Sequence, residues 1–307
     1  MRYDMSGFMQ QCVDRYLDCV GELGLSTSFL AKVKAAGTPF LDIEDGPDEP
    51  SDGVLSSAAC KVLMKILYGA RACRFDLLRP IAYLATRITK WSKACDKLLH
   101  RLVCYIAATK EYQLEGYVGD AADKLKITVW SDADFAGCKV TKRSTSGVFI
   151  AITGPNTFFP LNAISKKQSC VSHSTPEAEL VALALSIRTE GIPSQLLWDV
   201  VFDRRVHLQI MEDNQPAIQV VKTGKNPNMR HMSRTHGVCH MWIHETVSNP
   251  EMHCSIEHCE TTAMAADVFT KPFFDVQKWN HAISLIGIKA PLKKAYEPSR
   301  QTAAGGA

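Results

Sequence analysis

Seven acidic side chains stand where an expected strand ends or an expected helix begins. They are Asp132 and Asp134, Glu177 and Glu179, Glu212 and Asp213, and Asp267. Clustered carboxylates repel one another and take up protons unless cations neutralise them. Carboxylate oxygens suit Mg²⁺ or Mn²⁺, and two such ions about 3.5–4 Å apart can promote cleavage of a phosphodiester. If these positions converge, metal-dependent hydrolysis is the chemistry that they favour.

The elements that would position these acids lie in the second half of the chain. Their order, strand-strand-strand-helix-strand-helix-strand-helix, predicts an α/β fold in which helices pack on a mixed five-stranded sheet. The expected strands begin near residues 126, 145, 156, 206 and 251. The expected helical stretches begin near residues 174, 216, 235 and 263, and the two at 216 and 235 both lie between the fourth and fifth strands. The carboxyl ends of strands are where open α/β sheets place their sites, which is where several of the acids fall.

The first half of the chain has a different residue pattern. One or two short helices are expected in residues 1–35, and the acid-rich stretch 41–53 reads as a solvated linker. Residues 56–109 have the apolar spacing of two or three packed helices. We therefore divide the chain into residues 1–55, a helical connection at 56–120, an α/β domain at 125–274, and a C-terminal helix with a disordered tail at 275–307.

Composition excludes some classes of protein. The 307 residues are 46% apolar and 22% charged, which is ordinary for a globular chain, and the net charge of +3 does not mark a nucleic-acid binder by itself. Eleven cysteines are irregularly spaced without a CxxC motif, which indicates reduced thiols and an intracellular, non-secreted protein. No apolar run approaches 18 residues, so no membrane span is expected.

An ordered series of motifs resembles the ribonuclease H region of Ty1/copia-type retrotransposon polyproteins. The series is SDADFAG, RSTSG, ISKKQ, SHSTPEAELVAL, MEDNQ, RHMSRTH and AADVFTKP, collinear over about residues 127–273. Upstream, ACKVLMKILYGARACRFD and WSKACDKLLHRLVCYI resemble the connection that follows the polymerase, and RYDMSGFMQQCVDRY resembles the end of the polymerase itself. The resemblance implies a ribonuclease H-like sheet preceded by a helical connection.

The resemblance also chooses among the acids. It implies that Asp132, Glu179, Asp213 and Asp267 hold two Mg²⁺ or Mn²⁺ ions and are the catalytic residues. Ser174 and Glu177 fit a capping box, which leaves Glu179 free. Asp134 remains the alternative to Asp132, because residues i and i+2 of a strand share a face.

The implied substrate is an RNA·DNA hybrid, of which the RNA strand is cut. Lys142, Arg143, Lys166 and Lys167 are candidates for holding phosphates, which orient a duplex without reading its sequence. Asn214 could contact a ribose 2′-OH, the group that distinguishes RNA from DNA. The polymerase portion of the same polyprotein is the expected protein partner, and the expected location is the cytoplasm, in virus-like particles, or the nucleus.

Departures from the family pattern leave other readings open. Cys138 stands where an acid usually follows FAG, Ala163 replaces a tryptophan, Met264 replaces a glutamine, and Phe75 replaces the middle residue of RPD. No Asp-Asp pair occurs, so we expect no reverse transcriptase activity and a fragment or truncated reading frame. The alternatives are a non-catalytic nucleic-acid-binding remnant and an integrase-like nuclease acting on DNA, against which the helical position of Glu179 argues.

Overall fold

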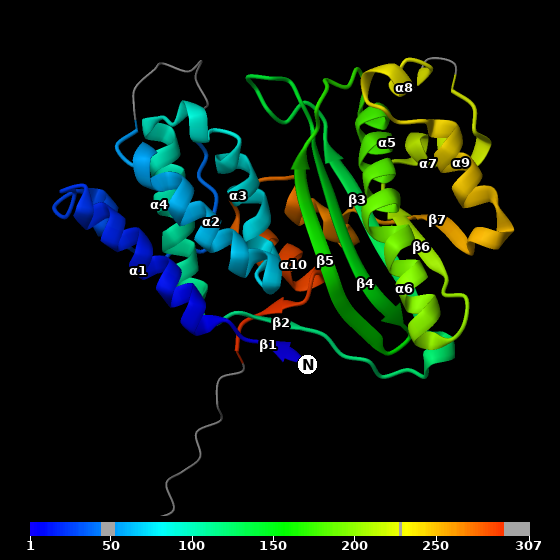
Figure 1. Ribbon diagram of the computed structural model, residues 1–307, viewed down its shortest axis with the longest axis horizontal. Helices are drawn as coiled ribbons and strands as arrows, with labels where there is room; N and C mark the ends of the chain where they lie inside the picture. Colours follow the sequence, from blue (N-terminus) through cyan, green and yellow to red (C-terminus); the bar gives the residue numbers. More distant parts are fainter. Residues whose placement is uncertain (44–52, 227–228, 292–307) are drawn as a thin grey trace, which may run out of the picture.

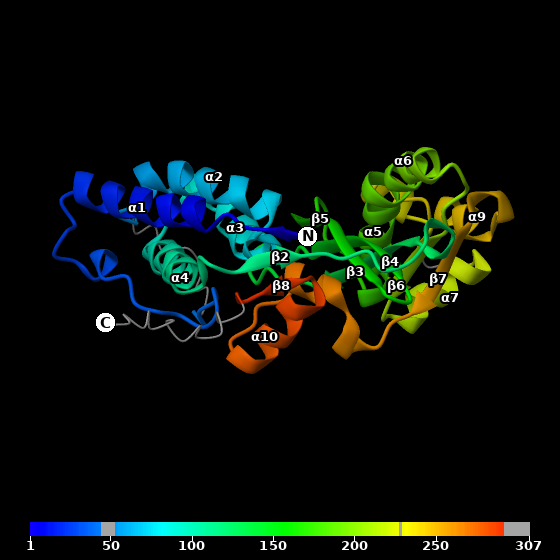
Figure 2. The same cartoon turned by 90° about the horizontal axis from the view of Figure 1, so that it is seen from below.

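A computed structural model of the chain describes residues 1–43, 53–226 and 229–291. Most of the expected acidic linker and the expected disordered tail from residue 292 therefore lie outside the described residues. The described chain forms a sheet with one group of helices on one face and a second group of helices against the other face (Figures 1 and 2). The second group contains segments from both ends of the described sequence.

The predicted mixed five-stranded sheet is confirmed. Its order is β5-β4-β3-β6-β7, antiparallel from β5 to β3 and parallel from β3 to β7. The strands are β3 (Lys126–Asp134), β4 (Thr145–Gly154), β5 (Thr157–Lys167), β6 (Leu208–Glu212) and β7 (Cys254–His258). Because β3 and β6 are parallel neighbours, their carboxyl ends meet at one edge of the sheet.

One face of the sheet is covered by the helices that follow β5. Ile127 and Val129 of β3 and Val148 and Ile150 of β4 share a buried core with these helices, as the alternation of side chains along a strand requires. The helices are α5 (Thr175–Ser186), α6 (Ile192–Phe202), α7 (Gln215–Thr223), α8 (Met232–Thr235) and α9 (His240–Ser248). A π-helical turn, Ile187–Gly191, joins α5 to α6.

The prediction of one continuous helix from residue 235 to 247 is wrong in detail. The structure has two helices here, α8 and α9, separated by Gly237. Gly237 has φ of +65°, a left-handed conformation that ends a helix and that glycine adopts at little cost. The sequence prediction of a helix near residues 235–247 did not locate this break.

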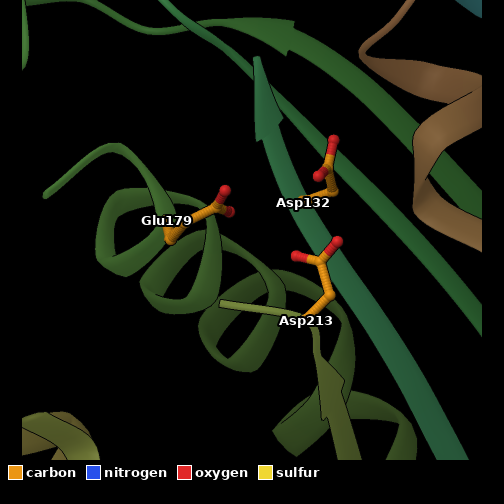
Figure 3. Close-up of side chains that lie close together, drawn as sticks. All are labelled: Asp132, Glu179 and Asp213. Atoms are coloured by element: carbon orange, nitrogen blue, oxygen red, sulfur yellow. The ribbon is translucent and has the colours of Figure 1, made fainter. Parts of the chain in front are cut away.

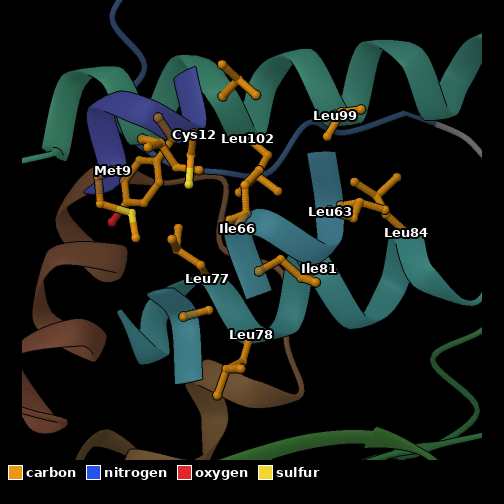
Figure 4. Close-up of a cluster of buried hydrophobic side chains, with 14 of the residues drawn as sticks. Met9, Cys12, Leu63, Ile66, Leu77, Leu78, Ile81, Leu84, Leu99 and Leu102 are labelled. Carbon is orange, nitrogen blue, oxygen red and sulfur yellow. The ribbon is translucent and has the colours of Figure 1, made fainter. Parts of the chain in front are cut away.

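The other face of the sheet is packed against a group of helices that we call the helical segment (Figure 4). It consists of α1 (Ser6–Glu22), α2 (Ser56–Ala72), α3 (Leu78–Ala85), α4 (Lys93–Thr109) and α10 (Val276–Leu285). Among the apolar residues of α2 and α4, Leu63, Ile66 and Leu102 are fully inaccessible. Phe149 of β4 and Trp279 of α10 belong to the same core, so the sheet and the helical segment are not packed separately.

A small sheet and a buried hydrogen-bond network connect segments that are distant in sequence within this part of the fold. A small sheet of order β1-β2-β8 pairs Arg2–Tyr3 with Gln113–Glu115 and Gln113–Glu115 with Ile288–Lys289. In the core, the Arg74 guanidinium donates to both carboxylate oxygens of Asp76 at 2.9 and 2.8 Å. Tyr105 donates to Asp76, and Trp279 donates to Tyr105. The two charged residues of the Arg-Phe-Asp sequence therefore form a buried ion pair.

Asp267 does not begin an α-helix, contrary to the sequence prediction. It lies in a 3₁₀ turn, η9 (Ala265–Phe269), and the next helix, α10, starts only at Val276. Pro272 accounts for the difference, because a proline lacks the N–H for a helical hydrogen bond and disfavours helical geometry in the residue before it. The short turn keeps Asp267, Thr270 and Lys271 close together at the edge of the sheet.

Candidate active site

Asp132 lies near the end of β3, where only a glycine fits on the neighbouring strand. Its register partner on β4 is Gly147. A Cβ atom at Gly147 would lie 2.6 Å from Thr270 Cγ2 and 2.8 Å from Ala266 O, so the missing side chain lets η9 lie directly against the sheet. Asp132 is consequently buried, with 2% of its surface exposed, and its Oδ2 accepts a hydrogen bond from the hydroxyl of Thr270.

The first turn of α5 separates the two candidate glutamates. The Ser174 side chain caps the helix by accepting from the Glu177 N–H at 3.4 Å. Glu177 accepts from the His173 N–H at 3.0 Å, and its other oxygen lies 2.9 Å from His236 Nε2. Glu177 is thus engaged at the start of the helix, although its carboxylate accepts from the residue before the N-cap and not from the N-cap N–H as in a capping box. Glu179 is buried, and its Oε2 has no hydrogen-bond partner among the described residues.

Three of the four predicted metal ligands converge. One carboxylate oxygen from each of Asp132, Glu179 and Asp213 lies within 4.8 Å of the other two. Figure 3 shows their side chains pointing toward a shared space between β3, α5 and the segment after β6. The parallel pairing of β3 with β6 explains this meeting, since it places the residue after β6 beside the end of β3.

The fourth predicted ligand, Asp267, lies beside this group and shares a cation with it. Lys271 Nζ lies 2.6 Å from Asp267 Oδ1 and 3.3 Å from Asp132 Oδ1. Asp267 and Lys271 are four residues apart, and the Lys271 backbone N–H donates to Asp267 O at 3.0 Å. An ammonium group therefore bridges the first and fourth acids of the predicted set.

Burial governs the electrostatics of the cluster. Desolvation, opposed by Lys271 and Thr270, raises the pKa of Asp132. Desolvation followed by the neighbouring charges of Glu212 and Asp132 raises the pKa of Glu179 well above its usual value. Desolvation and Asp132 raise the pKa of Asp267 to about 7. All three groups favour a proton in the folded chain unless a cation neutralises them.

The donor set fits hard divalent cations. It is made of carboxylate oxygens alone, without a cysteine or histidine ligand, which is the preference of Mg²⁺ and Mn²⁺. Glu179 Oε2 and Glu212 Oε2 are buried oxygens without a hydrogen-bond partner in the described parts of the chain. A buried polar atom without a partner destabilises the folded state. A cation bound in this space would therefore stabilise the fold.

Asp134 has a different environment, although it shares a face of β3 with Asp132. Its Oδ2 lies 3.3 Å from a terminal nitrogen of Arg79 in α3, and its Oδ1 accepts from the Thr145 N–H. Gly137 approaches it so closely that a Cβ there would lie 2.1 Å from Asp134 Oδ2. Burial, only partly offset by Arg79, raises the pKa of Asp134 to about 6. Its two oxygens are thus engaged outside the three-carboxylate group.

The predicted phosphate-binding residues lie on the β3–β4 turn and on β5. Lys142, Arg143 and Lys166 are exposed, and Lys142 adopts a left-handed φ of +55° in the turn. Lys167 Nζ lies 3.1 Å from Cys138 Sγ. Burial would raise the pKa of Cys138, but hydrogen bonds from Thr141 and Lys167 outweigh it and lower this pKa to about 7. The thiol that stands at the position of the usual acid is therefore in contact with Lys167.

Asn214, the candidate for a ribose contact, caps α7. Its Oδ1 accepts from the Ala217 N–H at 2.9 Å, which commits the oxygen to the helix. The amide nitrogen is the group left for a ligand.

Sequence reasoning did not give a role to three residues of the cluster. Glu212 is fully buried, its Oε1 accepts from the Asn214 N–H at 3.1 Å, and desolvation raises its pKa far above the usual value. The alternation of side chains along β6 could have predicted the burial of Glu212, since it shares the buried face of Leu208 and Ile210. Thr270 and Lys271 follow Asp267 closely in sequence, but their contacts with Asp132 depend on tertiary packing.

The strand order, the helices on both faces and the acids at the sheet edge define a ribonuclease H-like domain. In sequence, the homologues of this chain are Ty1 Gag-Pol polyproteins of Saccharomyces cerevisiae. The chain is 25% identical to the Ty1-JR2 polyprotein over 246 residues, or 78% of this chain, and 26% identical to the Ty1-GR3 polyprotein over 201 residues. These matches confirm the resemblance to the Ty1/copia type.

The chain spans only about 13% of the length of the Ty1-JR2 polyprotein. No family model matches the chain. Among solved structures, LC11 ribonuclease H1, isolated from compost by a metagenomic approach, is 15% identical and aligns with a TM-score of 0.34. That alignment covers 47% of this chain and 92% of the compost protein. In the described parts of the chain, no helix has the length and apolar character needed to cross a bilayer.

Proposed function

We propose that this chain is an endonuclease that hydrolyses the RNA strand of RNA·DNA hybrids, as part of a copia-type retrotransposon polyprotein. The observation that carries the proposal is the meeting of Asp132, Glu179 and Asp213 within 4.8 Å at the edge of the sheet. The homology to Ty1 Gag-Pol polyproteins over most of the chain supports the same conclusion.

The four predicted acids would hold two divalent cations, Mg²⁺ or Mn²⁺. When bound, such ions activate a water and stabilise the leaving oxygen of a phosphodiester. Asp132 presents its carboxylate from β3, and Asp213 presents its carboxylate from the position just after the parallel neighbour β6. Glu179 presents its carboxylate from the helix that covers them. Lys271 neutralises part of the negative charge around Asp132 and Asp267 while these acids have no other cation.

The substrate would lie across the edge of the sheet that carries these acids. Lys142, Arg143, Lys166 and Lys167 would hold phosphates on one side, because they occupy the turn after β3 and the end of β5. The amide nitrogen of Asn214, one residue from Asp213, would contact a ribose hydroxyl. Recognition of that hydroxyl would explain a preference for an RNA strand over DNA.

A cleavage assay tests the proposal directly. The full chain, incubated with end-labelled RNA·DNA hybrid and Mg²⁺, is expected to cut the RNA strand and to leave duplex DNA intact. The Asp213→Asn variant, purified in parallel, should have no activity above the EDTA control. Cutting that persists in this variant would place the reaction elsewhere. Hybrid binding without cutting would favour a non-catalytic remnant, and strong cutting of duplex DNA would favour an integrase-like nuclease.

Binding of the hybrid is expected to be mainly electrostatic. Each phosphate that a lysine or arginine neutralises lowers log K by about 0.9 per tenfold rise in salt on a B-form duplex. Replacing Lys166 and Lys142 by glutamine should therefore weaken binding and make its salt dependence shallower by roughly two units of slope. Fluorescence anisotropy with uncleavable hybrid in EDTA measures both quantities. An affinity that does not change with salt would contradict this assignment of the basic residues.

A further inference from the structure

We infer that the helical segment is a working part of the candidate active site, and that Arg79 of α3 is the positioning residue that connects them. This inference rests on the proposed function, because it assigns Arg79 a role in holding the acids that would bind metal. The connection is made to η9, the short turn that carries Asp267 and leads to Thr270 and Lys271.

The contacts form a continuous path. Arg79 Nε donates to Thr270 O at 2.8 Å, and a terminal nitrogen of Arg79 lies 3.3 Å from Asp134 Oδ2. The hydroxyl of Thr270 donates to Asp132. One guanidinium therefore joins α3 to the end of β3 and to the residue that contacts the first acid of the site. Arg79 is separated by 191 residues from Thr270 and by 55 from Asp134.

Arg79 is suited to this role because its partners belong to different elements. A guanidinium presents several N–H donors in a rigid plane, whereas a lysine ammonium is a point charge on a flexible chain. The side chains of Arg79 and Asp134 are only 11% and 12% exposed, so the solvent screens their attraction weakly. A cavity of about 330 Å³ adjoins them and is lined in part by Tyr83, Lys271 and Phe274. Packing does not close this side of Arg79, so its hydrogen bonds hold Thr270 where the cavity lies, in addition to the packing of Ala266 and Phe269 against the sheet.

The other end of the path is buried and held by several hydrogen bonds. Arg79 follows closely after Arg74 and Asp76, whose fully buried ion pair is held further by Thr109 and Tyr105 of α4. Pro80 and Ile81 are buried beside Arg79 in α3. A displacement of the helical segment would therefore be transmitted through Arg79 to Thr270, and from Thr270 to Asp132.

A matched control exists in the same helical segment. Arg101 of α4 makes the same kind of bond, from its Nε to the backbone carbonyl of Thr38 at 2.7 Å, and from a terminal nitrogen to Thr38 Oγ1 at 3.3 Å. It bonds no acid of the site. If Arg79 only stabilises the fold, Arg79→Gln and Arg101→Gln should behave alike.

The experiment compares these two variants in the full chain. The Mg²⁺ concentration that gives half of the melting-temperature shift is measured for each, together with kcat and KM for hybrid cleavage. Partners of metal-binding side chains typically contribute about 10- to 100-fold in metal affinity or activity. We expect Arg79→Gln to raise the half-effect Mg²⁺ concentration by about tenfold or more and to lower kcat with little change in KM. Arg101→Gln should shift the metal-free melting temperature only.

Two further variants guard against misfolding. Asp134→Asn keeps the bond from Arg79 to Thr270 and should have a smaller effect on Mg²⁺ than Arg79→Gln. Arg79→Lys should recover part of the loss, because an ammonium can reach one of the two acceptors. An unchanged half-effect concentration in Arg79→Gln, with the wild type responding to Mg²⁺, would overturn the inference and leave the proposed function intact. A wild type that neither responds to Mg²⁺ nor cuts hybrid would overturn both.

Discussion

Replacing Glu179 by glutamine is expected to abolish hybrid cleavage and to raise the melting temperature of the metal-free protein. Activity should fall by more than about 100-fold, since even the outer partners of metal ligands contribute about 10- to 100-fold. Stability should rise because burial and Glu212 disfavour the carboxylate of Glu179, whereas glutamine bears no charge to be desolvated. A loss of function that accompanies a gain of stability is the signature of a strained site rather than of a damaged fold.

The size of the stability gain follows from the raised pKa. Between the unfolded pKa of Glu179 and its raised folded pKa, each unit of rise in pH destabilises the wild type by about 1.36 kcal/mol. In a domain of 150–250 residues, about 1 kcal/mol moves the melting temperature by roughly 2–4 °C. Above neutral pH and in EDTA, we therefore expect Glu179→Gln to melt at least a few degrees higher than the wild type. Differential scanning calorimetry measures this shift.

Glu177 provides the matched control two residues away on the same helix. Its carboxylate accepts from the His173 N–H and contacts His231 and His236. Burial opposes its charge, but these hydrogen bonds outweigh it, so the pKa of Glu177 is lowered. Glu177→Gln should therefore lower the melting temperature and leave most of the cleavage activity. If both glutamine variants shift stability in the same direction, the assignment of Glu179 to the strained cluster is wrong.

Local rules account for much of the fold that the sequence predicted. Alternation along β3 and β4 separates side chains of the two cores, and a helical period marks the buried stripe of α2. Each pattern depends on which face of a single strand or helix is buried, so it can be recognised in the sequence without the tertiary structure. The break at Gly237 and the shortness of η9 were missed because single residues, a left-handed glycine and Pro272, override an otherwise helical pattern.

The choice between two neighbouring acids could be predicted from the sequence where a residue nearby in the chain engages one of them. The Glu177 carboxylate accepts from the N–H of His173 at the start of the helix, which leaves Glu179 for the cluster. Asp132 and Asp134 are two residues apart on one strand, so their side chains lie on the same face and the alternation cannot distinguish them. The two are distinguished by Arg79 of the helical segment and by Thr270 of η9, residues 55 and 138 positions away in sequence. No local pattern contains that information.

The acids of the cluster should also make the stability of the metal-free protein fall as pH rises. Burial raises the pKa values of Asp132, Glu179 and Asp267 above those of an unfolded carboxyl group, which are near 4. In the interval between the unfolded and the folded value, the folded state binds more protons, so raising the pH favours unfolding. The window begins near pH 4 and reaches at least the folded pKa of Asp267, about 7.

Mg²⁺ should oppose this loss, and its effect should grow with pH. Carboxylates must be deprotonated to bind a metal, and only the folded chain brings residues 132, 179 and 213 together. At about a hundredfold excess over Kd the stabilisation is about 2.7 kcal/mol, which corresponds to roughly 5–10 °C. Calorimetry in EDTA and in Mg²⁺ at constant ionic strength, near pH 5.5 and near pH 8, measures the difference. Titration of His100 and His207, whose pKa values burial lowers, is common to both conditions and cancels. A metal shift that is as large near pH 5.5 as near pH 8, or that survives in Glu179→Gln, would mean that these acids do not form the metal site.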